Sequence, residues 1–300
     1  MREVNDSKRI FAQDKIDVSC GLCGADNPEL LFIKDTFRHV RCSRCGMVYV
    51  TPRLRNASRQ QEIFYENYAC SSEDSAEIAS KDYRGSRRKR LIAEAESYRL
   101  YYKTGYILDI GCGFGGFLRA ASEKGWPHPE GIEIASQAAA YAQRFFPVKT
   151  TELKKDTYKK NLFDVVRLNN VIEHLPSPRK LVEGVHHILR PGGLFAIATT
   201  NFDSFSVTIC GSAWQYIGGA DHIYLFTPKT LALLLEENDF KVVRLKTKGI
   251  HLTPKTHGHR PSATMQRLYG KGIKVIEGVL DRFVRHTSKG HRLKIWAVKI

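Results

Sequence analysis

The segment YILDIGCGFGG, residues 106–116, joins an apolar run to a turn that is rich in glycine. The run YILDI predicts a buried strand, and the pattern that begins at Phe114 predicts a helix directly after the turn. Gly111, Gly113 and Gly116 allow a sharp turn and let a ligand approach the backbone at the helix N-terminus. Taken alone, this spacing also satisfies the GxGxxG pattern of dinucleotide-binding proteins.

Strand-like and helix-like segments alternate after this turn. Strands are predicted at 131–134, 163–168, 193–199 and 240–245, and helices at 136–145, at 177–189 and after Thr227-Pro228. This alternation predicts a parallel sheet that is covered by helices on both faces. Glu133 follows the second strand, where a carboxylate can hold the two hydroxyls of a ribose.

The composition is that of a globular protein with a local excess of positive charge. Lys and Arg total 47 against 31 acids, a net charge of +16, and the last 55 residues, from Lys246 on, contribute +11 of it. Such a field attracts nucleic acid, acidic lipid or a phosphorylated small molecule, or it only keeps the protein soluble. No run of eighteen apolar residues exists, and the N-terminus lacks an apolar segment, so we expect a cytoplasmic protein without a transmembrane segment.

Four cysteines form two matched pairs. Cys20 and Cys23, and then Cys42 and Cys45, have the CxxC spacing of a four-thiolate zinc site, and a glycine follows each pair. Zinc bound by four thiolates has no open position for water, so its role would be to fold a short segment without a core of its own. A redox pair is the alternative, but two matched units around a hairpin-sized segment favour a small zinc ribbon.

Three further motifs accompany the glycine turn in order along the chain. Asp109 precedes the turn in LDIGCGFG, FDVVRLNNVIEHLPSP occupies residues 163–178, and LRPGGLFAI occupies residues 189–197. Together they resemble class I S-adenosylmethionine (SAM)-dependent methyltransferases over roughly residues 98–300. The resemblance implies a Rossmann-like, mostly parallel sheet of seven strands. Its last strand, expected at 291–299, would run antiparallel between strands five and six.

The same resemblance implies a set of cofactor-binding residues. The glycine turn would lie under the methionine part of SAM, and Glu133 would accept hydrogen bonds from both ribose hydroxyls. Asp109 would lie behind the turn, and Asn169 and Asn170 beside the methionine or the transferred methyl. The turn residues concerned are Gly111, Cys112, Gly113 and Gly115.

Other stretches narrow the resemblance. The CxxCG pairs with MVYVTPR, FYENY and HIYLFTPKTL are similar to bacterial methyltransferases that carry an N-terminal zinc-binding segment and act on sugars, surface glycans or secondary metabolites. An aromatic residue of the FYENY stretch covers the cofactor pocket in those relatives, so Tyr65 or Tyr68 would do so here, unless both pack in the core. We expect a zinc-binding segment at 1–55, a helical connector at 56–104 and the methyltransferase domain at 105–300.

Methyl transfer to an alcohol requires a base for the proton of the nucleophile. His222 is the first candidate, because it lies on the loop after strand five that borders the acceptor pocket in this fold. Glu173 and His174 are the second candidate. In ubiquinone-type O-methyltransferases a similar pair binds a divalent ion with an upstream carboxylate, but Asn170 occupies that position here. A structural role in the turn before Pro176 is the alternative for this pair.

We therefore expect a SAM-dependent methyltransferase with a structural zinc. Its acceptor would be an anionic small molecule, a sugar nucleotide or a glycan, and O-methylation is favoured. A zinc-ribbon RNA methyltransferase or nucleic-acid-binding protein is the alternative, although LNNVIEHL lacks the Asn/Asp-Pro-Pro-aromatic loop and no RNA-binding module is recognisable. Apolar residues from Met265 to Phe283 form a stripe at helical spacing, with basic residues elsewhere around the helix, so this segment would pack on the sheet as a helix or contact an anionic membrane peripherally.

Overall fold

A seven-stranded sheet forms the centre of the protein. The computed structural model describes residues 15–34, 36–55, 77, 79–81, 83–218, 221–252, 277–278, 280–281, 284 and 287–300. The strand order of the sheet is β12-β13-β10-β9-β6-β7-β8. Its strands are β6 (Tyr106–Ile110), β7 (His128–Ile132), β8 (Val148–Lys149), β9 (Phe163–Asn169), β10 (Leu189–Thr200), β12 (Phe240–Lys248) and β13 (Arg292–Lys299).

The strand directions confirm the fold expected from the sequence. β6 pairs in parallel with β7 and β9, and β10 pairs in parallel with β9. β13 runs antiparallel to both of its neighbours, β10 and β12. The short strand β8 was not predicted, because two residues carry no readable periodicity. The carboxyl ends of the parallel strands share one edge, where a ligand site is expected in an open α/β sheet.

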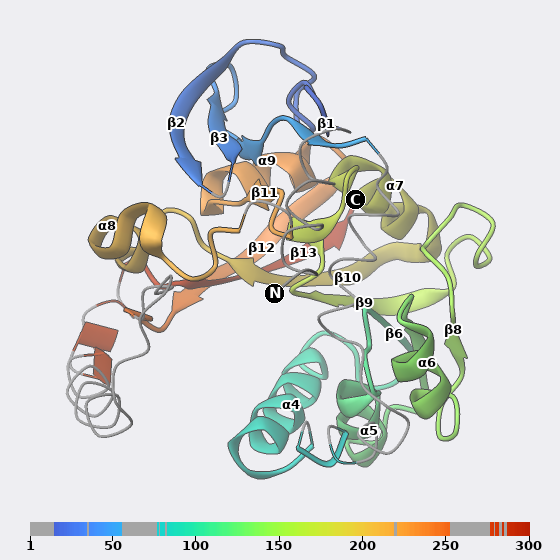
Figure 1. The fold of residues 1–300 in the computed structure, drawn as a ribbon. Helices are drawn as coiled ribbons and strands as arrows, with labels where there is room; N and C mark the ends of the chain where they lie inside the picture. Colours follow the sequence, from blue (N-terminus) through green and yellow to red (C-terminus); the bar gives the residue numbers. More distant parts are fainter. Residues whose placement is uncertain are drawn as a thin grey trace, which may run out of the picture.

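Helices cover both faces of this sheet. In Figure 1, α4, α5 and α6 lie below it, and α7 and α9 lie above it. Thr227 begins α9 with a capping box to Thr230, as the cap-then-proline signal predicts. None of the described helices is long and apolar enough to cross a membrane. The helices are α4 (Gly85–Tyr98), α5 (Gly116–Glu123), α6 (Ser136–Ala142), α7 (Pro178–Ile188), α8 (Phe205–Cys210) and α9 (Pro228–Glu236), with the 3-10 turns η1 (Ile172–His174) and η2 (Gly211–Ala213).

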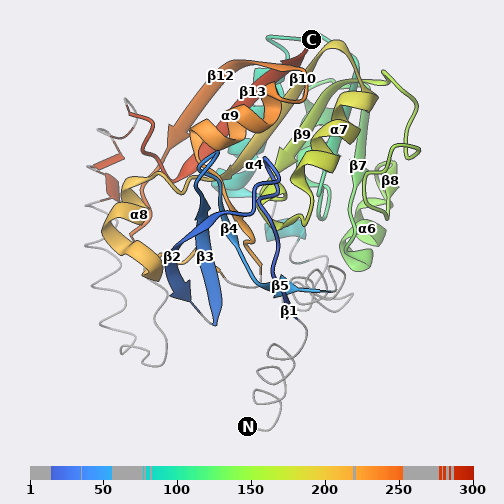
Figure 2. The ribbon, with the colours of Figure 1, turned by 90° about the horizontal axis from the view of Figure 1, so that it is seen from above.

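A second sheet joins the N-terminal segment to the rest of the chain. Its order is β11-β4-β3-β2, and β11 comes from the segment that follows α8. Figure 2 shows the blue strands of the N-terminal segment beside α9. The strands are β2 (Pro28–Lys34), β3 (Phe37–Cys42), β4 (Val48–Val50) and β11 (Tyr224–Leu225), and a separate pair is formed by β1 (Lys15–Ile16) and β5 (Arg53–Leu54). The N-terminal segment therefore shares backbone hydrogen bonds with the methyltransferase-like part.

A buried ion network attaches α4 to the sheet beneath the glycine turn. Arg167 on β9 donates to Asp109 over 2.7 Å and to Glu94 over 3.3 Å, and Lys294 lies 3.0 Å from Glu94. Burial raises the pKa of Asp109 to about 6, although Arg167 opposes this shift. Burial would also raise the pKa of Glu94, but Arg167 and Lys294 hold it well below its usual range. Arg167 thus compensates the buried charge of Asp109 and shares Glu94 with Lys294.

Replacing Arg167 by methionine is expected to destabilise the protein strongly. The substitution Arg167→Met leaves Asp109 and Glu94 without this cation, so the free energy of unfolding should fall by about 3–5 kcal/mol in urea titrations. The loss should be larger at pH 8 than at pH 5, because burial without Arg167 raises the pKa of Asp109 still further above that of the unfolded chain, and the folded variant must then bury this charge at pH 8. Arg88→Met, which removes a partner of Glu123 at the surface, should leave the midpoint nearly unchanged. Equal losses in the two variants would contradict the role of Arg167.

Candidate functional site

A large cavity opens at the carboxyl ends of the parallel strands. Its volume is about 1560 Å³, and its walls include the glycine turn, Glu133, the end of β9 and one face of α4. Small-molecule sites usually occupy about 300–1,000 Å³. The volume exceeds that of one such site because the cavity continues along α7 to Asn161 and Lys299, at the opposite edge of the sheet.

The glycine turn provides an open cradle on one wall of this cavity. Gly111, Gly113 and Gly115 have φ values of 74°, 54° and 80°, which favour glycine. A Cβ atom on Gly111 would lie 2.4 Å from Cγ2 of Val171, whereas a Cβ atom on Gly113 would have no neighbour within 4 Å. The turn thus packs closely on its inner side and leaves its outer side open. Cys112, which also lines the cavity, is buried.

Glu133 lies next to the turn, at the end of β7. Its carboxylate accepts hydrogen bonds from the backbone N–H groups of Gly113 (2.8 Å) and Ala135 (2.9 Å). The side chain is buried but lines the cavity. These two bonds hold the carboxylate beside the turn while each oxygen keeps a further lone pair for a ligand hydroxyl. This geometry suits the role in ribose binding that the sequence predicts.

Asn169 and Asn170 line the cavity at the end of β9. Asn170 has a φ of 54°, a conformation that asparagine tolerates better than most residues, and its N–H donates to the carbonyl of Ala198. The side-chain oxygen of Asn169 accepts a hydrogen bond from Arg292 over 3.2 Å. Asp109, near the end of β6, also lines the cavity. The cofactor-binding residues predicted between Asp109 and Asn170 therefore all line this cavity or the turn within it.

Two histidines and two acids form a cluster next to the asparagines. The rings of His174 and His222 meet edge to face, with centroids 4.6 Å apart. Glu173 is fully buried, and neither carboxylate oxygen has a hydrogen-bond partner among the described residues. Glu173, His174 and His222 place one possible ligand atom each within 4.8 Å of one another, so the cluster could also hold a cation. Burial would raise the pKa of Asp221, but His222 and its backbone N–H lower it below its ordinary value.

The two histidines differ in their relation to the cavity. His174 and Asp221 belong to its lining, and His222 and Glu173 do not. Nδ1 of His174 lies 2.8 Å from the backbone carbonyl of Asp221, and a carbonyl only accepts, so Nδ1 is the donor. The neutral ring then carries its proton on Nδ1 and its basic lone pair on Nε2.

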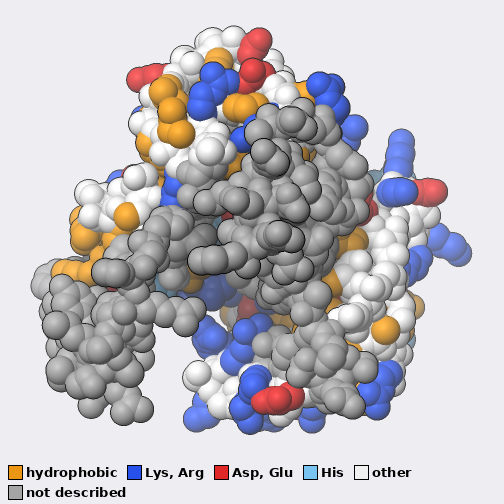
Figure 3. Space-filling model, viewed as in Figure 1, with side chains coloured by type: hydrophobic (Ala, Val, Ile, Leu, Met, Phe, Trp, Pro, Cys, Tyr) orange, Lys and Arg blue, Asp and Glu red, His pale blue; other side chains and the backbone are white. Residues whose placement is uncertain are grey.

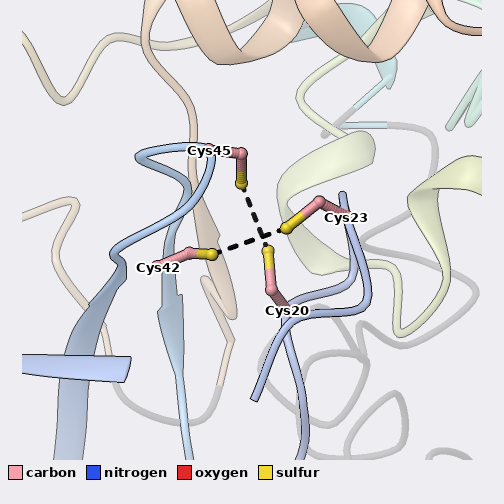
Figure 4. A group of neighbouring side chains, drawn as sticks. All are labelled: Cys20, Cys23, Cys42 and Cys45. Carbon is pink, nitrogen blue, oxygen red and sulfur yellow. Dashed lines mark hydrogen bonds between the residues drawn. The ribbon is translucent and has the colours of Figure 1, made fainter. Parts of the chain in front are cut away.

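The four cysteines of the N-terminal segment converge on one point. Figure 4 shows the sulfurs directed toward a common centre from two loops, and all four lie within 4.8 Å of one another. Cys20 and Cys45 are 3.5 Å apart at their sulfurs, as are Cys23 and Cys42. Tetrahedral zinc with bonds of about 2.3 Å requires sulfur separations of about 3.8 Å. The arrangement therefore fits the four-thiolate zinc site that the spacing predicts.

Backbone contacts connect the N-terminal segment to the histidine cluster. The N–H of Ile223 donates to the carbonyl of Glu173, and the carbonyl of Ile223 accepts from the N–H of Val50, both over 3.0 Å. The ring of His39 on β3 lies 2.9 Å from the carbonyl of Gly218, close to the loop that bears Asp221. His39 carried no signal in the sequence, because its partner is far away along the chain.

Some predicted residues cannot be placed. Tyr65 and Tyr68 lie outside the described residues, and so does most of the segment from Met265 to Phe283. Their predicted contacts with the cofactor, with the sheet or with a membrane remain predictions.

Comparison with known proteins agrees with this geometry. Residues 83–245 match the family model of a methyltransferase domain. The ubiquinone biosynthesis O-methyltransferase of Coxiella burnetii (strain RSA 331) is 26% identical over 162 residues, which cover 50% of this chain and 68% of that protein. The enzyme of the same name from Colwellia psychrerythraea is 27% identical over 168 residues, which cover 51% and 67%.

Solved structures share the fold. A SAM-dependent methyltransferase from Archaeoglobus fulgidus matches with a TM-score of 0.52 and 23% identity, covering 74% of this chain and 98% of that one. The 1,6-didemethyltoxoflavin-N1-methyltransferase of Burkholderia thailandensis matches with a TM-score of 0.53 and 17% identity, covering 91% and 99%. Since the family match spans more than half of the sequence, the chain belongs to the methyltransferase domain family and is a class I SAM-dependent methyltransferase.

Proposed function

We propose that this protein transfers a methyl group from SAM to a hydroxyl of a small-molecule, sugar-nucleotide or glycan acceptor. One observation carries the proposal: the glycine turn and Glu133 share a single cavity with Asn169, Asn170 and His174. The similarity to enzymes named ubiquinone biosynthesis O-methyltransferase supports an oxygen nucleophile.

The chain would act mainly by positioning the reactants. Bound SAM supplies an activated methyl group on a positively charged sulfur. The open side of Gly113 would support the methionine portion, and Glu133 would hold the ribose hydroxyls. Asn169 and Asn170 would border the reacting centre, where alignment and exclusion of water lower the barrier.

His174 would take the proton from the acceptor hydroxyl. It lines the cavity, and its Nε2 carries the basic lone pair when Nδ1 donates to Asp221. The buried carboxylate of Glu173 would stabilise the imidazolium that forms. His222, our first candidate from the sequence, lies behind His174 and would orient it through the ring contact.

Glu133→Gln is expected to weaken SAM binding. The amide keeps the shape of the side chain but removes the negative charge that would strengthen the hydrogen bonds from the two ribose hydroxyls. The Kd for SAM should therefore rise at least about tenfold in calorimetry. Glu236→Gln on the surface of α9 is the control and should bind like the parent protein. Unchanged affinity in Glu133→Gln would exclude the ribose contact.

The two histidines can be separated by their kinetics. His174→Ala should reduce kcat by about a hundredfold or more at an unchanged Kd for SAM, because a general base contributes about 10²–10⁴ in rate. His222→Ala should reduce kcat less than His174→Ala does, because His222 only orients the ring of His174. A larger reduction of kcat in His222→Ala than in His174→Ala would make His222 the base. If the parent protein transfers methyl groups only after Mg²⁺ or Mn²⁺ is added, Glu173, His174 and His222 would bind a divalent cation instead of acting as a base. Acceptors to screen with labelled SAM include sugar nucleotides, phenols, glycans and RNA.

We also propose that the four cysteines bind a structural zinc ion. Their sulfur separations and the two equivalent turns, in which Gly24 and Gly46 donate backbone hydrogen bonds to Cys20 and Cys42, support this. The ion would hold the loops from which β3 and β4 extend. Because β4 pairs with β11, the metal would stabilise the segment that carries His222.

Metal analysis of the purified protein should find about one zinc per chain. Cys20→Ser is expected to abolish this zinc and to lower the melting temperature, since the ion replaces a hydrophobic core for the segment. Cys210→Ser, outside the cluster, should retain the zinc. A stoichiometric zinc that persists in Cys20→Ser would argue against the four-thiolate site.

A further inference from the structure

Basic side chains gather where α4 faces the end of the sheet. Those that line the cavity come from α4, β9, β12 and β13, and the acids beside them among the described lining residues are Glu94 and Asp109. Figure 3 shows Lys and Arg side chains over the lower part of the molecule, where α4 lies in Figure 1, as well as elsewhere on this face. The cations that line this part of the cavity are Arg87, Arg90, Arg167, Lys248, Arg292 and Lys294.

The sheet itself places like charges opposite each other. In the antiparallel pairing of β12 with β13, Lys248 faces Arg292 and Lys246 faces Lys294. Directly opposed residues project to the same face, so two successive pairs of cations share one side of the sheet. Such pairs are unfavourable by themselves.

The neighbouring acids offset only part of this charge. Glu94 contacts Lys294 and Arg167, and Asp109 contacts Arg167. Asp281 accepts a hydrogen bond from the backbone of Gly249 and lies near Lys248. Arg90, Arg292 and Lys248 therefore form a cationic group beyond the ion network; we call these three residues the anion triad.

The anion triad repels itself in the absence of a ligand. Desolvation lowers the pKa of Arg292; Glu94 opposes this shift, and Arg90 adds a smaller contribution in the same direction as desolvation. Desolvation together with Arg292 and Arg90 lowers the pKa of Lys248. Both shifts show that the cationic forms are disfavoured in this surrounding. A bound anion would reverse this effect.

The triad lies at the reacting end of the cavity. Thr200 and Arg292 are paired, so Arg292 begins β13 at the edge where the parallel strands β9 and β10 end. Its guanidinium contacts Asn169, which borders the predicted position of the methyl group. A group bound by Arg292 would therefore sit beside the acceptor hydroxyl rather than beside Glu133.

We propose that Arg292, Lys248 and Arg90 form a binding site for a phosphate-type dianion carried by the methyl acceptor. The inference rests on the proposed function and makes it narrower, because it selects phosphorylated acceptors among small molecules, sugars and glycans. Arginine binds phosphate through two parallel hydrogen bonds, and three cations match a dianion better than a single carboxylate. The carboxylate of SAM is the other anion that could occupy the triad, and the experiment separates the two.

Calorimetry with S-adenosylhomocysteine and then with pyrophosphate tests the site. Binding of S-adenosylhomocysteine is measured first, and its absence would count against the proposed function itself. Pyrophosphate is then titrated into the protein saturated with S-adenosylhomocysteine, where the amino-acid carboxylate already occupies its own site. We expect binding that weakens at least about tenfold in Lys248→Gln and further in the double variant Lys248→Gln, Arg292→Gln.

Matched variants define the outcomes. Lys241→Gln, on the same strand but outside the cavity, should bind pyrophosphate like the parent protein. Lys248 is exposed, so its substitution should test the site with little effect on the stability of the fold. Absence of pyrophosphate binding, equal binding in Lys248→Gln and Lys241→Gln, or competition between pyrophosphate and S-adenosylhomocysteine would each overturn the proposal. Loss of S-adenosylhomocysteine affinity in Lys248→Gln would assign the triad to the carboxylate of the donor and overturn it as well.

Discussion

The close contact between Gly111 and Val171 sets the geometry on which the cavity depends. A side chain on Gly111 would collide with Val171 at 2.4 Å, so only glycine lets the turn after β6 approach the segment after β9. Val171 is followed by η1, which carries Glu173 and His174. One van der Waals contact therefore brings the glycine turn next to the segment that carries Glu173 and His174. Closely packed protein interiors transmit small displacements, so this contact defines the spacing between the glycine turn and the segment that begins at Val171.

The N-terminal segment acts on the same region from the opposite side. Ile223 is bonded to Glu173 through its N–H and to Val50 through its carbonyl, so a continuous backbone path runs from the cysteine loops to η1. The ring of Tyr224 lies beneath Arg53, 4.4 Å from its guanidinium carbon. The segment is thus packed into the methyltransferase fold rather than appended to it. A metal ion bound in this segment would therefore stabilise the position of η1 as well as the fold of the segment itself.

The distribution of charge separates two tasks. Arg167 is enclosed with Asp109 and Glu94 and stabilises the base of the cavity, where the pairing is nearly complete. Arg292 and Lys248 line the cavity opposite each other, and Glu94 and Asp281 are the described acids that oppose their charge. Buried pairs contribute mainly by avoiding unpaired charges, whereas surplus charge at a cavity wall attracts ligands.

Local pattern alone determined the α/β alternation, the glycine turn, Glu133 and the cysteine spacing, because each depends on neighbouring residues and on period or turn geometry. The resemblance to a known family added the strand order and the antiparallel last strand. The tertiary structure decided which histidine lines the cavity, that β11 pairs with β4, and that Lys248 lies opposite Arg292. All three features depend on contacts between segments that lie far apart in the chain. Their register is set by packing of the whole domain, which no single stretch of sequence encodes.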